Sequence, residues 1–333
     1  MRYKEIPARA PVSRMPIIPA SFFAIVLGLV ALGGGWRVAV RIWPVTPVIG
    51  EAIMLVAALV WLVLIGLYAA KWLVARDAAV AEFRHPIQSG FVSLVPGSTM
   101  LAALALMFVS RPLALALFGL GAAGHVAFLV WRLGFLWQGN RTPEQTTPVL
   151  YLPPVACNFI AAIVAGGLGL PEWGVPFFGA GMLFWLVTES IVVHRLMVHE
   201  PLPGPLRPTM GILIAPPAVG CIAWLSINGG DPDFLAQGML GYALIQAAVL
   251  LRRGTWLRQP FAASAWAYTF GVGALAQVPM RFVLGGMGAP FDSLALGMFA
   301  AANLIVAAIA LGTLRLLLRG RLLPPAGTPV AKG

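Results

Sequence analysis

Ten runs of mostly apolar residues, each about 20 long, divide almost the whole sequence. A helix of roughly 20 apolar residues can cross the hydrocarbon core of a bilayer. The runs are continuous rather than alternating, which disfavours a membrane β-barrel. We therefore expect an all-α integral membrane protein with ten transmembrane helices. Their ranges are 16–35, 48–71, 86–109, 113–135, 148–170, 174–194, 208–228, 234–251, 261–284 and 291–315.

The composition supports this reading and excludes other classes. Hydrophobic residues make up 60% of the chain and charged residues 10%, whereas soluble domains are about 25% charged. The net charge of +11 comes from basic residues that flank the apolar runs. No basic segment carries interleaved aromatic residues, so we expect no nucleic-acid partner. The first apolar run continues to about Gly35 without a polar cleavage region, which indicates a retained helix rather than a signal peptide.

The distribution of Lys and Arg predicts the orientation. With ten crossings, the side that holds both termini carries 18 of the 22 basic residues. The other side carries four, Arg37, Arg41, Arg111 and Arg281. The positive-inside rule therefore places both termini in the cytoplasm. We expect an N-terminal tail over 1–15, one membrane domain over 16–318 and a C-terminal tail over 319–333.

Proline separates the odd-numbered runs from the even-numbered ones. Each odd run has a proline at or just before its start. The odd runs carry further prolines inside, at Pro19, Pro96, Pro153, Pro154, Pro216, Pro217 and Pro279. An interior proline removes a backbone hydrogen bond and kinks a helix, and the freed carbonyl must find protein or water. The pattern predicts five related helical hairpins around a central pore. The kinked odd helices would form the inner ring and the even helices the outer ring.

Several sequence blocks resemble a known family. They are YLPPVACNFIAA (151–162), FFGAGMLFWLVTES (177–190), RPTMGILIAPPAVG (207–220), AWLSINGGDPD (223–233) and WAYTFG (266–271). They are similar to the tellurite-resistance/dicarboxylate transporter family, which includes bacterial TehA, the plant guard-cell slow anion channel and fungal malate and sulfite transporters. The match runs in order over roughly residues 16 to 318.

The resemblance implies a homotrimer in which each subunit has its own anion pore. It also implies that a phenylalanine on the ninth helix occludes the pore, and WAYTFG assigns this role to Phe270. Gly271 and Gly273 would give this ring room to rotate. The first helix departs from the family pattern, because Val26 stands where we expect proline and Ala24 where we expect a glycine facing the pore.

The odd runs carry almost no charged residues, which favours a passive conduit over a coupled transporter. Arg281 is their one charged residue, whereas a coupled transporter usually keeps ionisable groups at membrane depth. Weak binding to amide dipoles would favour anions that dehydrate easily, such as nitrate over chloride. The candidate pore-lining residues are Ala24, Pro96, Asn158, Pro216 and Gly271.

A basic cytoplasmic rim would attract anions to the inner mouth of the pore. Its candidates are Arg84, Arg207, Arg252, Arg253 and Arg258, although membrane topology alone also explains these arginines. The expected partners are small anions, namely nitrate, chloride, and tellurite or dicarboxylate, together with membrane lipid. A proton-coupled carrier of C4-dicarboxylate, sulfite or tellurite remains the alternative. It would need a titrating residue, for which Glu189 is the candidate.

Other motifs carry less chemistry. GLGAAG (119–124) fits a nucleotide-binding pattern but lies in an apolar run, where glycine permits helix packing. His125 in the same run is expected to be a satisfied interior residue, and Glu189 to pair with Arg195 or a neighbouring loop. Cys157 and Cys221 are expected to be buried free thiols. No nucleophile–base pair or metal-ligand spacing is present in the sequence, so we expect no enzyme activity, cofactor or metal.

Overall fold

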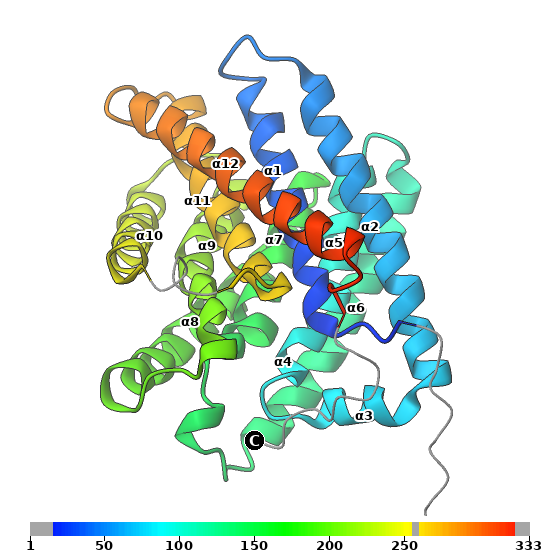
Figure 1. Ribbon diagram of the computed structural model, residues 1–333. Helices are drawn as coiled ribbons and strands as arrows, with labels where there is room; N and C mark the ends of the chain where they lie inside the picture. The colour runs from blue at the N-terminus through cyan, green and yellow to red at the C-terminus, as the bar shows by residue number, and fades with distance from the viewer. Residues whose placement is uncertain (1–15, 255–259, 324–333) are drawn as a thin grey trace, which may run out of the picture.

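The chain folds into a bundle of long helices (Figure 1). The computed structural model describes residues 16–254 and 260–323, and these contain helices and turns but no strand. Nine helical segments in this part of the chain are long and apolar enough to cross a membrane. The prediction of an all-α membrane protein is therefore confirmed. The main helices are α1 (Ala24–Ala39), α2 (Pro47–Val74), α5 (Leu94–Leu106), α6 (Arg111–Leu136), α7 (Cys157–Gly167), α8 (Pro171–Val198), α9 (Ala215–Ile227), α10 (Phe234–Arg253), α11 (Trp266–Leu284) and α12 (Phe291–Leu318).

The predicted ninth span, 261–284, differs from the others. It forms α11, but this helix is not among the nine apolar candidates. Gln277 and Arg281 lie on it and lower its hydropathy. Most of α11 is nevertheless buried inside the bundle. A polar side chain on such a helix can face protein or an aqueous cavity instead of lipid.

Burial divides the helices into two classes. The spans that contain α1, α5, α7 and α9 are 67%, 72%, 83% and 78% buried, whereas those of α2, α6, α8, α10 and α12 are 22% to 33% buried. A helix that is apolar on every side but mostly exposed needs lipid around it. We call α1, α5, α7, α9 and α11 the inner helices and the other five the outer helices.

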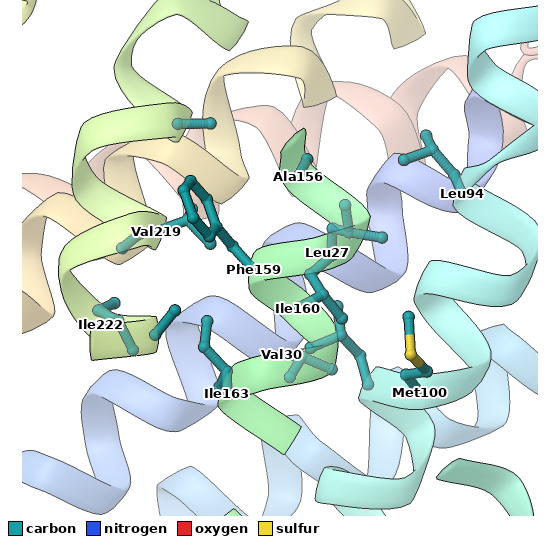
Figure 2. Packing of buried hydrophobic residues seen from close by; sticks show 14 of the residues in the cluster. Leu27, Val30, Leu94, Met100, Ala156, Phe159, Ile160, Ile163, Val219 and Ile222 are labelled. Atoms are coloured by element: carbon teal, nitrogen blue, oxygen red, sulfur yellow. The ribbon is translucent and has the colours of Figure 1, made fainter. Parts of the chain in front are cut away.

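Contacts between the inner helices close into a ring. The contacting pairs are α1 with α5, α5 with α7, α7 with α9, α9 with α11, and α11 with α1. Each inner helix also packs against the outer helix that follows it in the chain. Close packing of side chains fills part of the ring, and Figure 2 shows residues of α1, α5, α7 and α9, among them Val30, Ile160 and Met100, meeting in this core.

The prolines of the inner segments mostly lie where one helix type changes into another. Pro19 precedes the 3-10 turn Ala20–Phe23, which leads into α1. Pro153 and Pro154 lie in a single π-helical turn, Leu152–Ala156, before α7. Pro216 and Pro217 begin α9 after the 3-10 segment Gly204–Ile214. Proline is tolerated at the first turn of a helix because its missing N–H would have no partner there. Pro279, in contrast, lies inside α11.

A buried ion pair fixes the end of the bundle at which α1 begins. The short helix α3 (Arg76–Arg84) lies across this end (Figure 1). Its Glu82 accepts a hydrogen bond from Lys71 Nζ at 2.7 Å, and the two side chains are 10% and 4% exposed. Glu82 also accepts from Tyr68 Oη at 3.2 Å and from the backbone N–H of Ala20 at 2.8 Å. One carboxylate therefore connects α2, α3 and the entry to α1.

Candidate functional site

A cavity of about 670 Å³ opens among the inner helices. All five contribute to its wall with residues that continue to, or just past, their C-terminal ends. The residues that each inner helix contributes nearest its N-terminus are Val30, Leu101, Ile163, Val219 and Phe270. These five define what we call the floor of the cavity. The cavity therefore enters the ring from the end opposite to α3 and stops partway through it.

Phe270 is the one aromatic member of this floor. It lies in the second turn of α11, is partly buried, and packs against the main hydrophobic core. The residues of α11 that follow it on the cavity wall are Ala274, Gln277, Arg281 and Leu284. Their spacing is that of one face of an α-helix. The face of α11 that carries Phe270 at the floor thus carries a charged arginine farther out.

Charge on the cavity wall is positive. Its charged residues are Arg37, Arg41, Arg281 and Glu51. Arg37 forms a two-point ion pair with Glu51, with Nε–Oε1 and Nη2–Oε2 distances of 2.8 Å each. Arg37 Nη1 also donates to the carbonyl of Leu104 at 2.8 Å. Since the single carboxylate is engaged in this pair, Arg41 and Arg281 leave the wall with a net positive charge.

The glycines beside Phe270 serve close helix packing. A Cβ added at Gly271 would lie 3.1 Å from Ala215 N and 3.2 Å from Ile214 Cβ. A Cβ added at Gly273 would lie 2.8 Å from Ala31 Cβ on α1. Gly271 and Gly273 are both buried, so their lack of a side chain is used for contact with neighbouring backbone. The structure thus gives these glycines a packing reason that the sequence did not reveal.

This packing yields a first prediction. We expect Gly273→Ala to lower the free energy of unfolding by about 1–3 kcal/mol, because the added methyl group meets a rigid neighbour in a filled core. Gly66→Ala is the matched control, since a Cβ added at Gly66 on α2 meets nothing within 4 Å. That control should gain up to about 1 kcal/mol from higher helix propensity. Thermal unfolding of the two purified variants in detergent measures the difference, and equal stability of both would contradict the packing argument.

Phe270, the predicted gate, lies on the cavity wall. None of the five candidate pore-lining residues lies on it: Ala24, Pro96, Asn158, Pro216 and Gly271. Pro96 faces α6, where its Cβ is 3.5 Å from the position of a Cβ at Gly124. Asn158 is 2% exposed and donates from Nδ2 to the carbonyl of Pro154 at 2.7 Å. Pro216 is buried at the start of α9, and Ala24 is the first residue of α1, before the floor.

The interior histidine is connected to this asparagine. His125 is fully buried on α6, and its Nε2 lies 3.1 Å from Asn158 Oδ1. Its Nδ1 finds no hydrogen-bond partner in the described part of the chain. The pair therefore bridges α6 and α7 away from the cavity, and the expectation of a satisfied histidine holds for one ring nitrogen.

The described members of the predicted basic rim, Arg84, Arg207 and Arg252, do not border the cavity. Arg84 ends α3, Arg207 lies in the 3-10 segment before α9, and Arg252 lies in the last turn of α10. Arg207 Nε donates to the carbonyl of Leu202 at 3.1 Å, a contact within its own loop. Arg258 lies outside the described residues, as does the side chain of Arg253. The cavity opens at the other end of the inner helices.

Glu189 has partners other than the one expected. Its carboxylate accepts hydrogen bonds from Tyr151 Oη at 2.8 Å, Trp185 Nε1 at 2.8 Å and Gln246 Nε2 at 3.2 Å, and a further short one from Tyr242. Of the two predicted partners, Arg195 is wrong, because Arg195 Nε donates to the carbonyl of Pro143 instead, at 3.2 Å. The alternative, a neighbouring connecting segment, fits Tyr151, which lies in the 3-10 turn Pro148–Tyr151. Glu189 therefore joins α8, α10 and the turn before α7 on the outside of the ring.

Sequence reasoning missed the charged wall of the cavity. In the sequence, Arg37 and Arg41 indicate only the membrane orientation, and Arg281 is the one charged residue of the odd runs. A signal was present, because Arg281 lies 11 residues after Phe270 and so returns to the same face of a helix after three turns. Cys157 and Cys221 are buried free thiols, as predicted. Within the described residues, no cluster of His, Cys, Asp and Glu is suited to holding a metal ion.

Comparisons with known proteins converge on one family. A family model described as a voltage-dependent anion channel, SLAC1, matches residues 18–314. The tellurite resistance protein TehA homolog of Haemophilus influenzae is 32% identical over 306 residues, which cover 91% of this chain and 92% of that protein. The S-type anion channel SLAH2 of Arabidopsis thaliana is 26% identical over 87% of this chain and 57% of its own length. The guard cell S-type anion channel SLAC1 of the same plant is 24% identical over 89% and 55%.

Proposed function

Because this chain belongs to the SLAC1 voltage-dependent anion channel family, we propose that it is a membrane anion channel that conducts small monovalent anions passively. One observation carries the proposal: a positively charged cavity enters the ring of inner helices and ends at Phe270. In this proposal ten transmembrane helices form five hairpins, and the bent inner helices line the pore. Anion flux into liposomes that contain the purified protein is the direct test.

Phe270 is the proposed gate. A bulky ring at an apolar constriction blocks ions in two ways, by its volume and by keeping water out. The other floor residues, Val30, Leu101, Ile163 and Val219, are apolar as well. An anion that reaches the floor would have to shed its hydration shell with no polar group to replace it. This barrier is a physical reason for a closed resting state.

Charge selection is the second element of the proposal. A cavity with one sign of charge and low-dielectric walls concentrates the opposite ion. Arg41 and Arg281 supply the positive charge, and Glu51 is paired with Arg37. Anions therefore accumulate above the gate, while cations are repelled. Beyond the arginines the wall is mostly apolar, which favours anions with a low cost of dehydration, with nitrate ahead of chloride.

The setting of this channel follows from the charge distribution. We place both termini in the cytoplasm, since 18 of 22 basic residues fall on the side of the termini. The relation to a bacterial TehA homolog supports a bacterial inner membrane as the location. The membrane domain covers 16–318. By its relation to TehA-type proteins the assembly is proposed to be a homotrimer in membrane lipid, with a link to tellurite resistance.

A proton-coupled carrier of dicarboxylate, sulfite or tellurite is the competing function, and Glu189 decides between the two. This carboxylate lies outside the ring and is held by four neutral donors, so a passive channel does not need its charge. We expect Glu189→Gln to leave anion flux within about twofold of the parent, measured in a gate-opened background. An imposed pH gradient should not drive uptake. Uptake that follows the pH gradient and disappears in Glu189→Gln would establish the carrier instead.

A further inference from the structure

Four arginines lie at the end of the bundle where the cavity opens, and they fall into two pairs. Arg37 is bound by Glu51 and by the carbonyl of Leu104. Arg111 donates from Nη2 to the carbonyl of Leu168, at 3.0 Å, just after the last turn of α7. These two arginines have structural partners. Arg41 and Arg281 make no side-chain hydrogen bond or ion pair with any described residue.

Of the two arginines without a described partner, Arg281 is the more informative. It lies on α11 about 16 Å beyond Phe270 along the helix axis, at a rise of roughly 1.5 Å per residue. The side chain is partly buried in the cavity wall, and its Nε is shielded from solvent without an acceptor among the described residues. A buried N–H without an acceptor is disfavoured. A negatively charged ligand in the cavity would supply the acceptor that the described residues do not.

Arg41 brings a second positive charge to the same place. It follows α1, is exposed, and lines the cavity together with Arg281. Because both side chains line the same cavity, their like charges repel each other across it. The described part of the cavity wall offers no carboxylate to relieve the repulsion, because Glu51 is bound to Arg37. An anion between or beside the two arginines would remove this cost.

We propose that Arg281 and Arg41 form a binding site for a small planar oxyanion of the nitrate type in the outer half of the cavity. The guanidinium is a planar fork of donors that binds two oxygens of such an ion with parallel hydrogen bonds, which a spherical halide cannot accept. The site lies above the floor, so an anion can bind there while Phe270 closes the path. The proposal rests on the proposed channel function for its role, since the bound ion would be the next one to permeate.

The test measures binding without conduction. Thermal unfolding of the full-length protein in detergent is followed by tryptophan fluorescence while nitrate replaces a bulky organic anion at constant ionic strength. A ligand that binds the folded state raises the melting temperature in a saturable way. We expect saturation in the wild type. In Arg281→Gln the half-saturating nitrate concentration should rise at least about tenfold, the equivalent of about 1.4 kcal/mol. Arg41→Gln should raise it severalfold.

Arg111→Gln is the matched control, because it removes one positive charge at the same end from a residue outside the cavity. It should titrate like the wild type. If Arg281→Gln fails to fold, Arg281→Lys keeps the charge without the fork and should weaken nitrate binding more than chloride binding. A wild type without saturable stabilisation, or an Arg281 variant that titrates like wild type, overturns the proposal.

The two proposals fail in different experiments. If the proposed anion site is wrong, the nitrate titration shows it, and that titration needs no open pore. If the proposed channel function is wrong, the flux assay on the gate-opened variant shows it. A protein that binds nitrate through Arg281 but conducts nothing would keep the site and refute the channel.

Discussion

Replacing Phe270 with alanine is expected to raise anion flux through liposomes at least about tenfold over the wild type, because each tenfold rate change corresponds to about 1.4 kcal/mol of barrier. The substitution removes the one aromatic ring from the floor of the cavity. The remaining floor residues are aliphatic, and the space left by the ring lets water and anions reach the other half of the ring of helices. Flux is measured on purified protein with a fluorescent anion indicator or as current in planar bilayers.

Two controls separate gating from general damage. Phe270→Trp keeps the constriction filled and should remain closed. Phe234→Ala removes the same ring from the first turn of α10, where it is 92% exposed, and should also remain closed. Bi-ionic reversal potentials of Phe270→Ala should show nitrate to be more permeant than chloride. Wild-type flux in Phe270→Ala would refute the gate, and a clear preference for chloride would refute the dehydration argument.

The second large effect is expected on stability, at the buried ion pair of Lys71 and Glu82 near the start of α1. Lys71→Met should lower the free energy of unfolding by about 3–5 kcal/mol, because it leaves the Glu82 carboxylate buried without its cation. Glu82 would keep its hydrogen bonds from Ala20 and Tyr68, which do not neutralise the charge. The consequence should reach the entry to α1, since Lys71 Nζ also donates to the carbonyl of Ile18 at 3.1 Å. Thermal unfolding in detergent measures the loss.

A double variant tests the cause of that loss. Lys71→Met combined with Glu82→Gln removes both charges and should recover more than half of the stability lost in Lys71→Met alone. Arg76→Met, on the exposed first turn of α3, is the control for loss of a basic side chain and should change stability by less than about 0.5 kcal/mol. A double variant as unstable as Lys71→Met alone would show that the unpaired charge of Glu82 is not the cause of the loss.

Much of the fold could be read directly along the chain. Membrane insertion depends on the apolarity of about 20 successive residues, so runs such as 48–71 and 291–315 were identified without tertiary information. The prolines distinguished the segments that the structure buries from those it exposes. Their physical role was less predictable. Pro153, Pro154, Pro216 and Pro217 mark changes of helix type, because the local hydrogen-bonding pattern depends on the neighbours that receive the freed carbonyls.

Only part of the candidate site could be predicted from the sequence. The motif around Phe270 identified the aromatic residue at the floor of the cavity, whereas Asn158 and Glu189 were assigned roles from their residue type alone. In the structure Asn158 bonds His125 and Glu189 bonds two tyrosines and a tryptophan. Except for Trp185, which lies on the same helix as Glu189, these partners come from other segments, and their identity depends on how each helix is rotated about its axis. No single-sequence pattern encodes that rotation.

The sequence by itself determined that this protein is helical and lies in a membrane, because apolar length is a property of consecutive residues. Only the tertiary structure decided that Arg41 and Arg281, which are far apart in the chain, share one cavity wall, while Glu51 neutralises Arg37 there. It also decided that Gly271 and Gly273 are sites of close backbone contact. The physical reason is that a cavity is what remains between helices after their side chains have packed, and that remainder is set by all the helices together.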